Sequence, residues 1–170
     1  MSGSLTLTPF SKAYLSLGSN IDAEANLRSA VDALRARFGG MTLSQAYLFP
    51  AVGFEGGDFL NAAAIITSDL DPQALNEWLH ALEDAHGRDR SGPRYGDRPL
   101  DIDIVFFDDL VLDGPGHLQI PRDELRHAFV LKPLAEIAPD HVDPCSARTL
   151  RELWRTHPDH AIPRATLALD

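Results

Sequence analysis

Two aspartates separated by one residue, Asp101 and Asp103, are the side chains best placed to do chemistry in this sequence. They lie in residues 100–107, where apolar residues alternate and predict a β-strand, so both carboxylates point to one face of a sheet. Their Cα atoms then lie about 6.5 Å apart, from the usual rise per residue. Carboxylates at this spacing can hold two Mg²⁺ ions, as in phosphoryl transfer. The alternative is a pair of solvated aspartates on an exposed sheet face.

An arginine-rich segment leads directly into this strand. Its cationic residues between positions 88 and 98 are Arg88, Arg90, Arg94 and Arg98. The formal net charge of the chain is −10, which argues against general binding of nucleic acid or of an anionic membrane. Guanidinium groups bind phosphate in a bidentate manner. The cluster therefore indicates a local phosphate site beside the carboxylates, although a salt-bridged surface loop is the alternative.

Other common site signatures are absent from the sequence. Neither G-x-x-x-x-G-K-[ST] nor G-x-G-x-x-G occurs, and Lys12 and Lys132 are the only lysines, which excludes a P-loop enzyme. Cys145 is the only cysteine, so no thiolate metal cluster and no internal disulfide can form. His157 and His160 have the spacing of metal ligands but lie in a charged tail, so we expect them on the surface.

The hydrophobic pattern predicts an α+β protein with a ferredoxin-like fold. The predicted order is strand, helix, strand, strand, helix, strand, in residues 13–18, 23–38, 41–49, 59–67, 72–86 and 100–107. This β-α-β-β-α-β order forms an antiparallel sheet with two helices on one face. A C-terminal helical extension follows, with a hairpin-like stretch at 110–120 and helices at 129–137 and 149–155.

The domain organisation expected from length is simple. Residues 1–12 are predicted to be a flexible N-terminal tail, and 13–170 a single domain. The tail lacks the charge and apolar core of a secretory signal, and no apolar run approaches the length of a membrane span. We therefore expect a cytoplasmic protein with no membrane partner.

Several motifs in this order resemble the 6-hydroxymethyl-7,8-dihydropterin pyrophosphokinase family. They are Leu17-Gly18-Ser19-Asn20, Asp58-Phe59-Leu60-Asn61-Ala62-Ala63, Arg98-Pro99-Leu100-Asp101-Ile102-Asp103-Ile104 and the stretch 129–139. The resemblance covers about residues 13–153. It implies transfer of diphosphate from ATP to the hydroxymethyl group of the pterin, giving AMP and the pterin diphosphate in tetrahydrofolate biosynthesis. It also implies two Mg²⁺ ions and small-molecule partners only, pterin and ATP, and we expect a monomer that binds no nucleic acid.

The resemblance assigns roles to matching positions. Asp101 and Asp103 hold the metal ions, and they act in catalysis together with Arg88, Arg90 and Arg98. The expected ATP-binding residues are His80, Glu83, Arg90, Arg94, Tyr95, Arg98, Ile104 and Arg122. The expected pterin-binding residues are Phe49, Pro50, Val52, Phe59, Asn61 and Phe129.

Some positions depart from the family pattern. Asp97, Pro99, Arg122 and His127 differ from the residues that the resemblance leads us to expect, which affects the ATP side of the site. Two other functions stay open at this point. One is a non-catalytic ferredoxin-like module that binds a nucleotide or a metal, since fold alone does not decide function. The other is a related pyrophosphokinase that accepts a different pterin.

Overall fold

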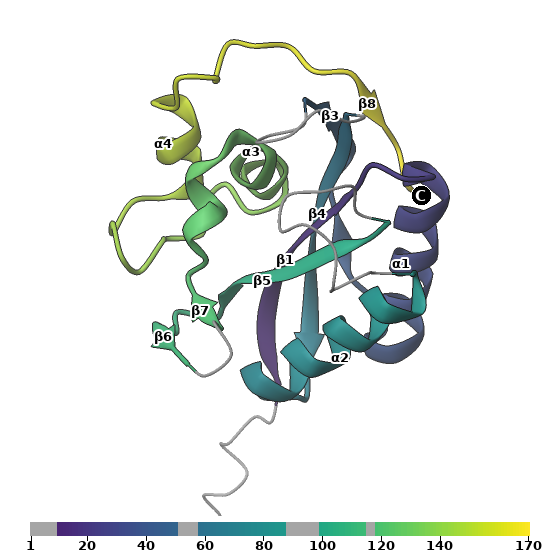
Figure 1. Cartoon of the computed structure of the whole chain (residues 1–170). Helices are drawn as coiled ribbons and strands as arrows, with labels where there is room; N and C mark the ends of the chain where they lie inside the picture. Colours follow the sequence, from purple (N-terminus) through teal and green to yellow (C-terminus); the bar gives the residue numbers. More distant parts are fainter. Residues whose placement is uncertain (1–9, 51–57, 88–98, 115–117) are drawn as a thin grey trace, which may run out of the picture.

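The computed structural model describes residues 10–50, 58–87, 99–114 and 118–170. These residues form a central sheet with helices packed on it. The sheet is six-stranded, in the order β5-β1-β4-β3-β8, with β2 also paired to β4 (Figure 1). Every pairing is antiparallel. The strands are β1 (Ser11–Ser19), β2 (Thr42–Leu43), β3 (Ala46–Phe49), β4 (Phe59–Ser68), β5 (Asp101–Phe107) and β8 (Thr166–Leu167).

Two helices cover one face of the sheet. They are α1 (Ala23–Phe38) and α2 (Pro72–Ala85), and they enclose a core that includes Leu15, Leu17 and Leu79. The predicted start of α2 is confirmed, because the Asp71 side chain accepts a hydrogen bond from the Ala74 N–H at 2.8 Å. Such a cap satisfies one of the four N–H groups that a helix start leaves without a partner.

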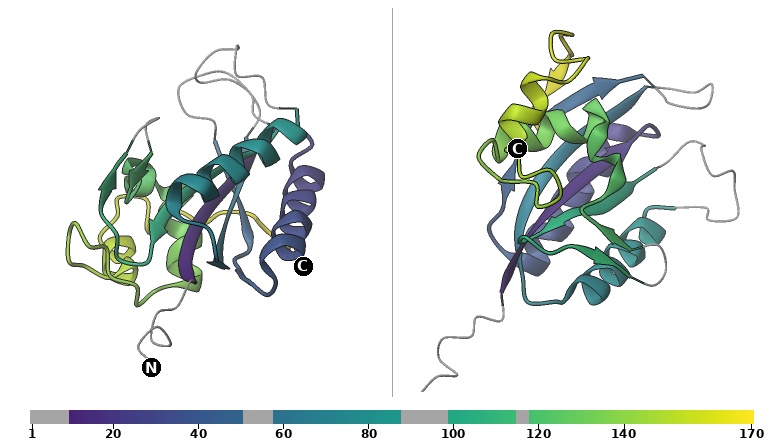
Figure 2. Two further views of the ribbon diagram at one scale, coloured as in Figure 1. Left: turned by 90° about the horizontal axis from the view of Figure 1, so that it is seen from below. Right: turned by 90° about the vertical axis from the view of Figure 1, so that its left-hand side faces the viewer.

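The C-terminal extension covers the opposite face, as the two views of Figure 2 show. A 3₁₀ turn (Asp123–Arg126) leads into α3 (Ala128–Ile137), and α4 (Leu150–Arg155) packs against α3. A second apolar core forms there from Tyr14, Phe106, Leu131 and their neighbours. The short hairpin of β6 (Leu112–Asp113) and β7 (Gln119–Ile120) precedes this layer, in agreement with the sequence.

A β-bulge at Val105 changes which residues of β5 face each core. Leu15 of β1 pairs with Ile104, but Tyr14 pairs with Phe106, so Val105 is the extra residue. The alternation predicted from the sequence therefore fails at this point. Phe106 packs in the core beneath α3, whereas Phe107 packs in the core beneath α1 and α2.

Three boundaries differ from the predicted ones. The strand expected at 41–49 is divided into β2 and β3, because Ser44 between them bonds to Ala63, its hydroxyl accepting from the Ala63 N–H at 2.8 Å. Ser11 and Lys12 belong to β1 although the sequence placed them in the tail, whose residues 1–9 lie outside the described ranges. The sequence did not predict β8. No helix in the described ranges combines the length and apolarity needed to cross a bilayer.

Candidate active site

Asp101 and Asp103 lie on the α3 side of the sheet. The neighbouring Leu100, Ile102 and Ile104 are buried in the opposite core, so the two carboxylates share the other face. They stand beside Gly18 and Ser16 of β1, respectively. Burial and the adjacent Asp101 carboxylate raise the pKa of Asp103 well above its usual range, and Arg122 opposes this shift. A second carboxylate beside Asp103 makes its ionisation costly, and a bound cation would relieve this cost.

Glu83 of α2 holds the main chain between these two aspartates. Its side chain is 2% exposed, and its Oε2 accepts a hydrogen bond from the Ile102 N–H at 2.8 Å. The outer edge of β5 is thus bound to α2 at this point. Further along the same edge, the Arg122 N–H donates to the carbonyl of Val105 at 3.1 Å. Both contacts fix the strand that carries the carboxylates. His80 lies one turn earlier on α2 and is exposed.

Arg122 places a cation against the carboxylate pair. Its Nε lies 3.6 Å from Oδ2 of Asp103 and 3.4 Å from Oε1 of Glu124. Burial lowers the pKa of Arg122, but the carboxylates of Asp103 and Glu124 outweigh this effect and raise it. The Nε is buried and has no hydrogen-bond partner of good geometry in the described part of the chain. This departure from the family pattern therefore lies beside the predicted metal ligands.

Asn61 projects from β4 toward the carboxylates across Gly18. In the sheet, Gly18 of β1 pairs with Asp101 on one side and with Asn61 on the other. A Cβ atom at position 18 would lie 2.8 Å from Asn61 Nδ2, so the glycine leaves the space that the amide occupies. Asn61 Oδ1 is buried without a hydrogen-bond partner among the described residues. A buried amide oxygen of this kind is costly unless a ligand completes it.

Aromatic side chains adjoin this amide. Phe49 is 3% exposed and packs edge-on against Phe129 of α3, with ring centroids 6.4 Å apart. Phe59 is the partner of Phe49 in the β3–β4 pairing. His127 stacks on the Phe129 ring with centroids 5.0 Å apart. The predicted pterin residues Phe49, Phe59, Asn61 and Phe129 therefore lie on adjoining elements around one side of the sheet.

Arg164 is a residue at this site that sequence reasoning missed. Its guanidinium carbon lies 4.8 Å from the centre of the Phe49 ring. The Leu48 N–H donates to the carbonyl of Ala165 at 3.0 Å, which fixes the C-terminal segment beside β3. Arg164 stands outside the range 13–153 that resembles the family, and nothing in its local sequence connects it with Phe49.

Not every predicted site residue can be placed. Ile104 is described, and its side chain is buried in the α1/α2 core, away from the carboxylate face. Pro50 is exposed at the end of β3. Several predicted residues lie outside the described ranges, namely Val52, Arg88, Arg90, Arg94, Tyr95 and Arg98.

His157, one of the two histidines with metal-ligand spacing, forms hydrogen bonds within the protein. His157 Nδ1 accepts a hydrogen bond from the Asp159 N–H at 3.0 Å, and its Nε2 contacts the Arg126 carbonyl at 2.9 Å. Both ring nitrogens are therefore engaged. Across the described residues, no group of three or more His, Cys, Asp or Glu side chains is arranged to hold a metal ion.

Comparison with known proteins decides the family. Residues 14–139 match the family described as 7,8-dihydro-6-hydroxymethylpterin-pyrophosphokinase (HPPK). The chain belongs to this family. The predicted resemblance is confirmed, and the HPPK match spans the carboxylate pair, Gly18, Asn61 and Phe129. It ends before α4 and the segment that carries Arg164.

Curated HPPK relatives are similar over most of their length. An enzyme of Methylorubrum extorquens named 2-amino-4-hydroxy-6-hydroxymethyldihydropteridine pyrophosphokinase is 41% identical over 146 residues, which are 83% of this chain and 90% of that protein. A protein of the same name from Pseudomonas aeruginosa is 34% identical over 160 residues, 90% of this chain and 96% of that one.

A solved structure supports the fold. The HPPK-DHPS protein of Plasmodium falciparum aligns with a TM-score of 0.63 at 14% identity, covering 86% of this chain and 44% of that one. This chain therefore spans less than half of that protein's length. At this identity, the likeness concerns the arrangement of helices and strands alone.

Proposed function

We propose that this chain transfers diphosphate from ATP to 6-hydroxymethyl-7,8-dihydropterin, releasing AMP, as a step of folate biosynthesis. One observation carries the proposal beyond family membership. The register of β5, β1 and β4 places Asp101, Gly18 and Asn61 in one row across the sheet. A carboxylate pair for the donor side and an unsatisfied amide for the acceptor side thus share one face.

The acceptor pocket forms around Asn61. Its Oδ1, which has no partner in the described protein, accepts a hydrogen bond from the pterin amide edge, and its Nδ2 donates one. Phe49, Phe59 and Phe129 supply aromatic surface for a flat heterocycle. Arg164 fixes the Phe49 ring from the C-terminal segment. Pro50 and Val52 extend the pocket through their main chain, as the resemblance implies.

Asp101 and Asp103 fit two Mg²⁺ ions, because two carboxylates on one face of β5 form a hard oxygen donor set. Bound there, the ions would neutralise charge on the phosphates and lower the pKa of the substrate hydroxyl. Glu83 keeps Ile102, and with it both aspartates, in place. Arg122 lies against Asp103 and compensates its charge, and the resemblance implies that it also contacts ATP.

The remaining ATP contacts rest on the resemblance. It implies that Arg98 and Arg88 or Arg90 clamp the phosphates, and that Arg94 and Tyr95 close over the nucleotide. His80 lines the nucleotide pocket. The resemblance also assigns Glu83 and Ile104 to this pocket, but both side chains are buried, so we propose that only the main chain around them contacts the nucleotide.

We also propose a ferredoxin-like topology for the sheet and a monomeric state for the protein. The order β5-β1-β4-β3, antiparallel throughout, supports the ferredoxin-like topology, to which β8 adds an edge strand. We propose a monomer in the cytoplasm that acts on pterin and ATP without a macromolecular partner.

The decisive assay combines ATP, Mg²⁺ and the hydroxymethyl dihydropterin and separates the nucleotide products. AMP formed in equal amount with pterin diphosphate supports the proposal, whereas ADP would refute it. Pterin binding without turnover indicates the non-catalytic module, and turnover only with another pterin indicates the related enzyme.

Two substitutions test the metal ligands. Asp101→Asn and Asp103→Asn should each remove most of the turnover, because each replaces an anionic oxygen ligand by a neutral amide. Pterin binding, measured by ligand fluorescence, should remain. Wild-type rates in either variant would exclude the carboxylate pair as the metal site.

A further inference from the structure

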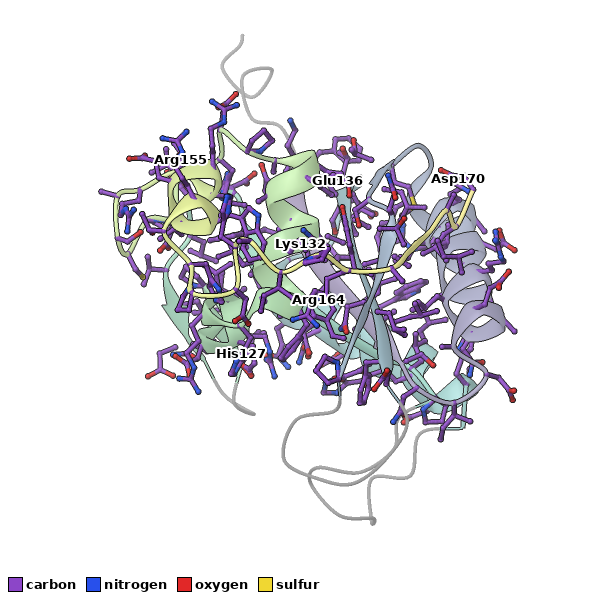
Figure 3. All side chains as sticks on the ribbon, turned by 90° about the horizontal axis from the view of Figure 1, so that it is seen from above. His127, Lys132, Glu136, Arg155, Arg164 and Asp170 are labelled. Carbon is purple, nitrogen blue, oxygen red and sulfur yellow. The ribbon has the colours of Figure 1, made fainter. Side chains whose placement is uncertain are left out.

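A recess lies beyond the aromatic side of the candidate active site, between β3, α3 and α4. Its volume is about 290 Å³. It is lined by Tyr47, Lys132, Ala135, Glu136, Pro139, Arg151, Trp154, Arg155 and His160, and we refer to it as the α3–α4 cleft. Figure 3 shows Lys132 and Glu136 on α3, with Arg155 on α4 and the C-terminal segment crossing beside α3. The proposed function uses none of these side chains.

The charges of the α3–α4 cleft are unusual for a chain of formal net charge −10. Three cationic side chains, Lys132, Arg151 and Arg155, line it together with a single carboxylate, Glu136. That carboxylate is engaged, because it accepts hydrogen bonds from the Tyr47 hydroxyl and from the Gln45 N–H at 3.2 Å. Burial and this contact raise the pKa of Tyr47, so its hydroxyl stays protonated and donates.

Two of the cations form no close ion pair in the described residues, although hydrogen bonds with Thr149 and, to a lesser extent, the Arg155 guanidinium lower the pKa of the nearby Glu152. Arg151 pairs with Asp140 at 3.1 Å, but neither Lys132 nor Arg155 forms an ion pair within the described part of the chain. The Lys132 ammonium instead lies 5.0 Å from the centre of the Trp154 ring and 5.2 Å from that of Tyr47. Aromatic faces hold a cation in place without neutralising it. The cleft thus presents fixed positive charge to whatever enters it.

The walls also provide apolar surface. The rings of Trp154 and Tyr47 and the side chains of Ala135 and Pro139 stand beside the cations. The volume is just below the range of typical small-molecule sites, which begins at about 300 Å³. A recess of this size accommodates one ring and one charged group, but no nucleotide or peptide segment.

We propose that the α3–α4 cleft binds a small organic oxyanion, a phosphate or carboxylate carried on a compact apolar body. Lys132 and Arg155 bind the oxyanion, and Trp154 contacts the body. This site is additional to the proposed pyrophosphokinase site and does not depend on it. It adjoins that site, however, because the ring centroids of Tyr47 and Phe49 lie 6.5 Å apart.

Tryptophan fluorescence can test the proposal directly. The chain has two tryptophans, and Trp78 packs against Phe38, so a Trp78→Phe variant leaves Trp154 as the only reporter. Phenyl phosphate and benzoate serve as probes, with EDTA present to keep metal ions from contributing. We expect saturable quenching with a Kd of about 1–10 mM by at least one probe. The stronger probe identifies the oxyanion as phosphate or carboxylate.

Substitutions show whether the probes bind specifically in the α3–α4 cleft or are attracted by positive charge in general. Lys132→Met keeps the aliphatic stem, and Arg155→Gln keeps a polar side chain; each should weaken binding about five-fold, since each removes one charge contact. Arg37→Gln is the matched control, because Arg37 pairs with Asp69 elsewhere on the surface, and it should leave the Kd unchanged. If Trp78→Phe does not fold, the two indole N–H signals of the wild-type chain give the same titration by NMR.

Three results would overturn the inference. They are the absence of saturable quenching by both probes, unchanged affinity in Lys132→Met and Arg155→Gln, and equal weakening in the Arg37→Gln control. Melting temperatures of all variants verify that a lost signal reflects lost binding and not unfolding.

Discussion

Replacing Gly18 by alanine should weaken pterin binding while leaving the fold intact. The new Cβ would lie 2.8 Å from Asn61 Nδ2, and ordinary contacts begin at 3.4 Å, so the amide must retreat by about 0.6 Å. The nearest backbone atom, the carbonyl oxygen of Leu60, is at 3.8 Å and needs no movement. The strain therefore falls on the side chain proposed to read the pterin.

The size of the effect follows from the hydrogen bonds at stake. Misaligning a buried amide from its ligand costs about 1–3 kcal/mol, which corresponds to a loss of roughly 5–150-fold in affinity. Because the flexible end of Asn61 absorbs the movement, the melting temperature should fall by less than about 3 °C. Pterin affinity is measured by ligand fluorescence, and KM and kcat by AMP release at saturating ATP and Mg²⁺.

Gly40 provides the matched control. A Cβ at this position would meet no atom within 4 Å, and like Gly18 its φ lies outside the left-handed region. Gly40→Ala should therefore change neither KM nor affinity. The reasoning would be refuted if Gly18→Ala bound pterin as tightly as wild type while melting normally, because Asn61 would then not act from the observed position.

Three further variants test the surroundings of the site. Glu83→Ala removes the acceptor of the Ile102 N–H, so it should cost about 1–3 kcal/mol of stability and lower kcat. Glu83→Gln keeps an acceptor oxygen and should therefore retain both stability and kcat. Melting and turnover assays measure the two effects. Asp103→Asn should raise the melting temperature of the metal-free protein at neutral pH, because the folded state raises the pKa of Asp103 and stability is lost as pH rises through that pKa. The gain should shrink in acid, and a gain that persists unchanged at low pH would contradict it. Arg164→Met removes one cation–π contact, so it should raise the pterin KM about 2–5-fold and leave kcat unchanged. Arg164→Lys keeps the positive charge and should show a smaller rise in KM. A change in kcat alone would exclude this role of Arg164.

The central layer of the fold was predictable because its signals are local. Helical spacing between Ala23 and Phe38 gave both bounds of α1, and the Asp71-Pro72 pair marked the start of α2. The one-face placement of Asp101 and Asp103 follows from strand geometry alone and agrees with the structure. The resemblance to HPPK, carried by several short motifs in order, is confirmed as well. The roles of the individual site residues stay predictions.

The features that the sequence did not reveal depend on contacts between distant segments. The strand β8 has two residues, which is too short for any periodic pattern, and it exists because Ala46 and Tyr47 offer an open edge. Arg164 joins the site through the same pairing. The resemblance assigns Glu83 to the ATP site, and no sequence pattern shows that its carboxylate accepts a hydrogen bond from the main chain of β5.

The bulge at Val105 divides β5 into two halves, which should differ in how well they tolerate an inserted or deleted residue. Gaining or losing one residue between Asp101 and Ile104 would exchange the two faces of this half-strand, sending a carboxylate into the apolar core and an isoleucine to the site. Beyond the bulge, the same change would only exchange Phe106 and Phe107, and both of their environments are apolar. We therefore expect length variation among relatives to be excluded from the first half of β5 and, where it occurs in this strand, to be confined to the second.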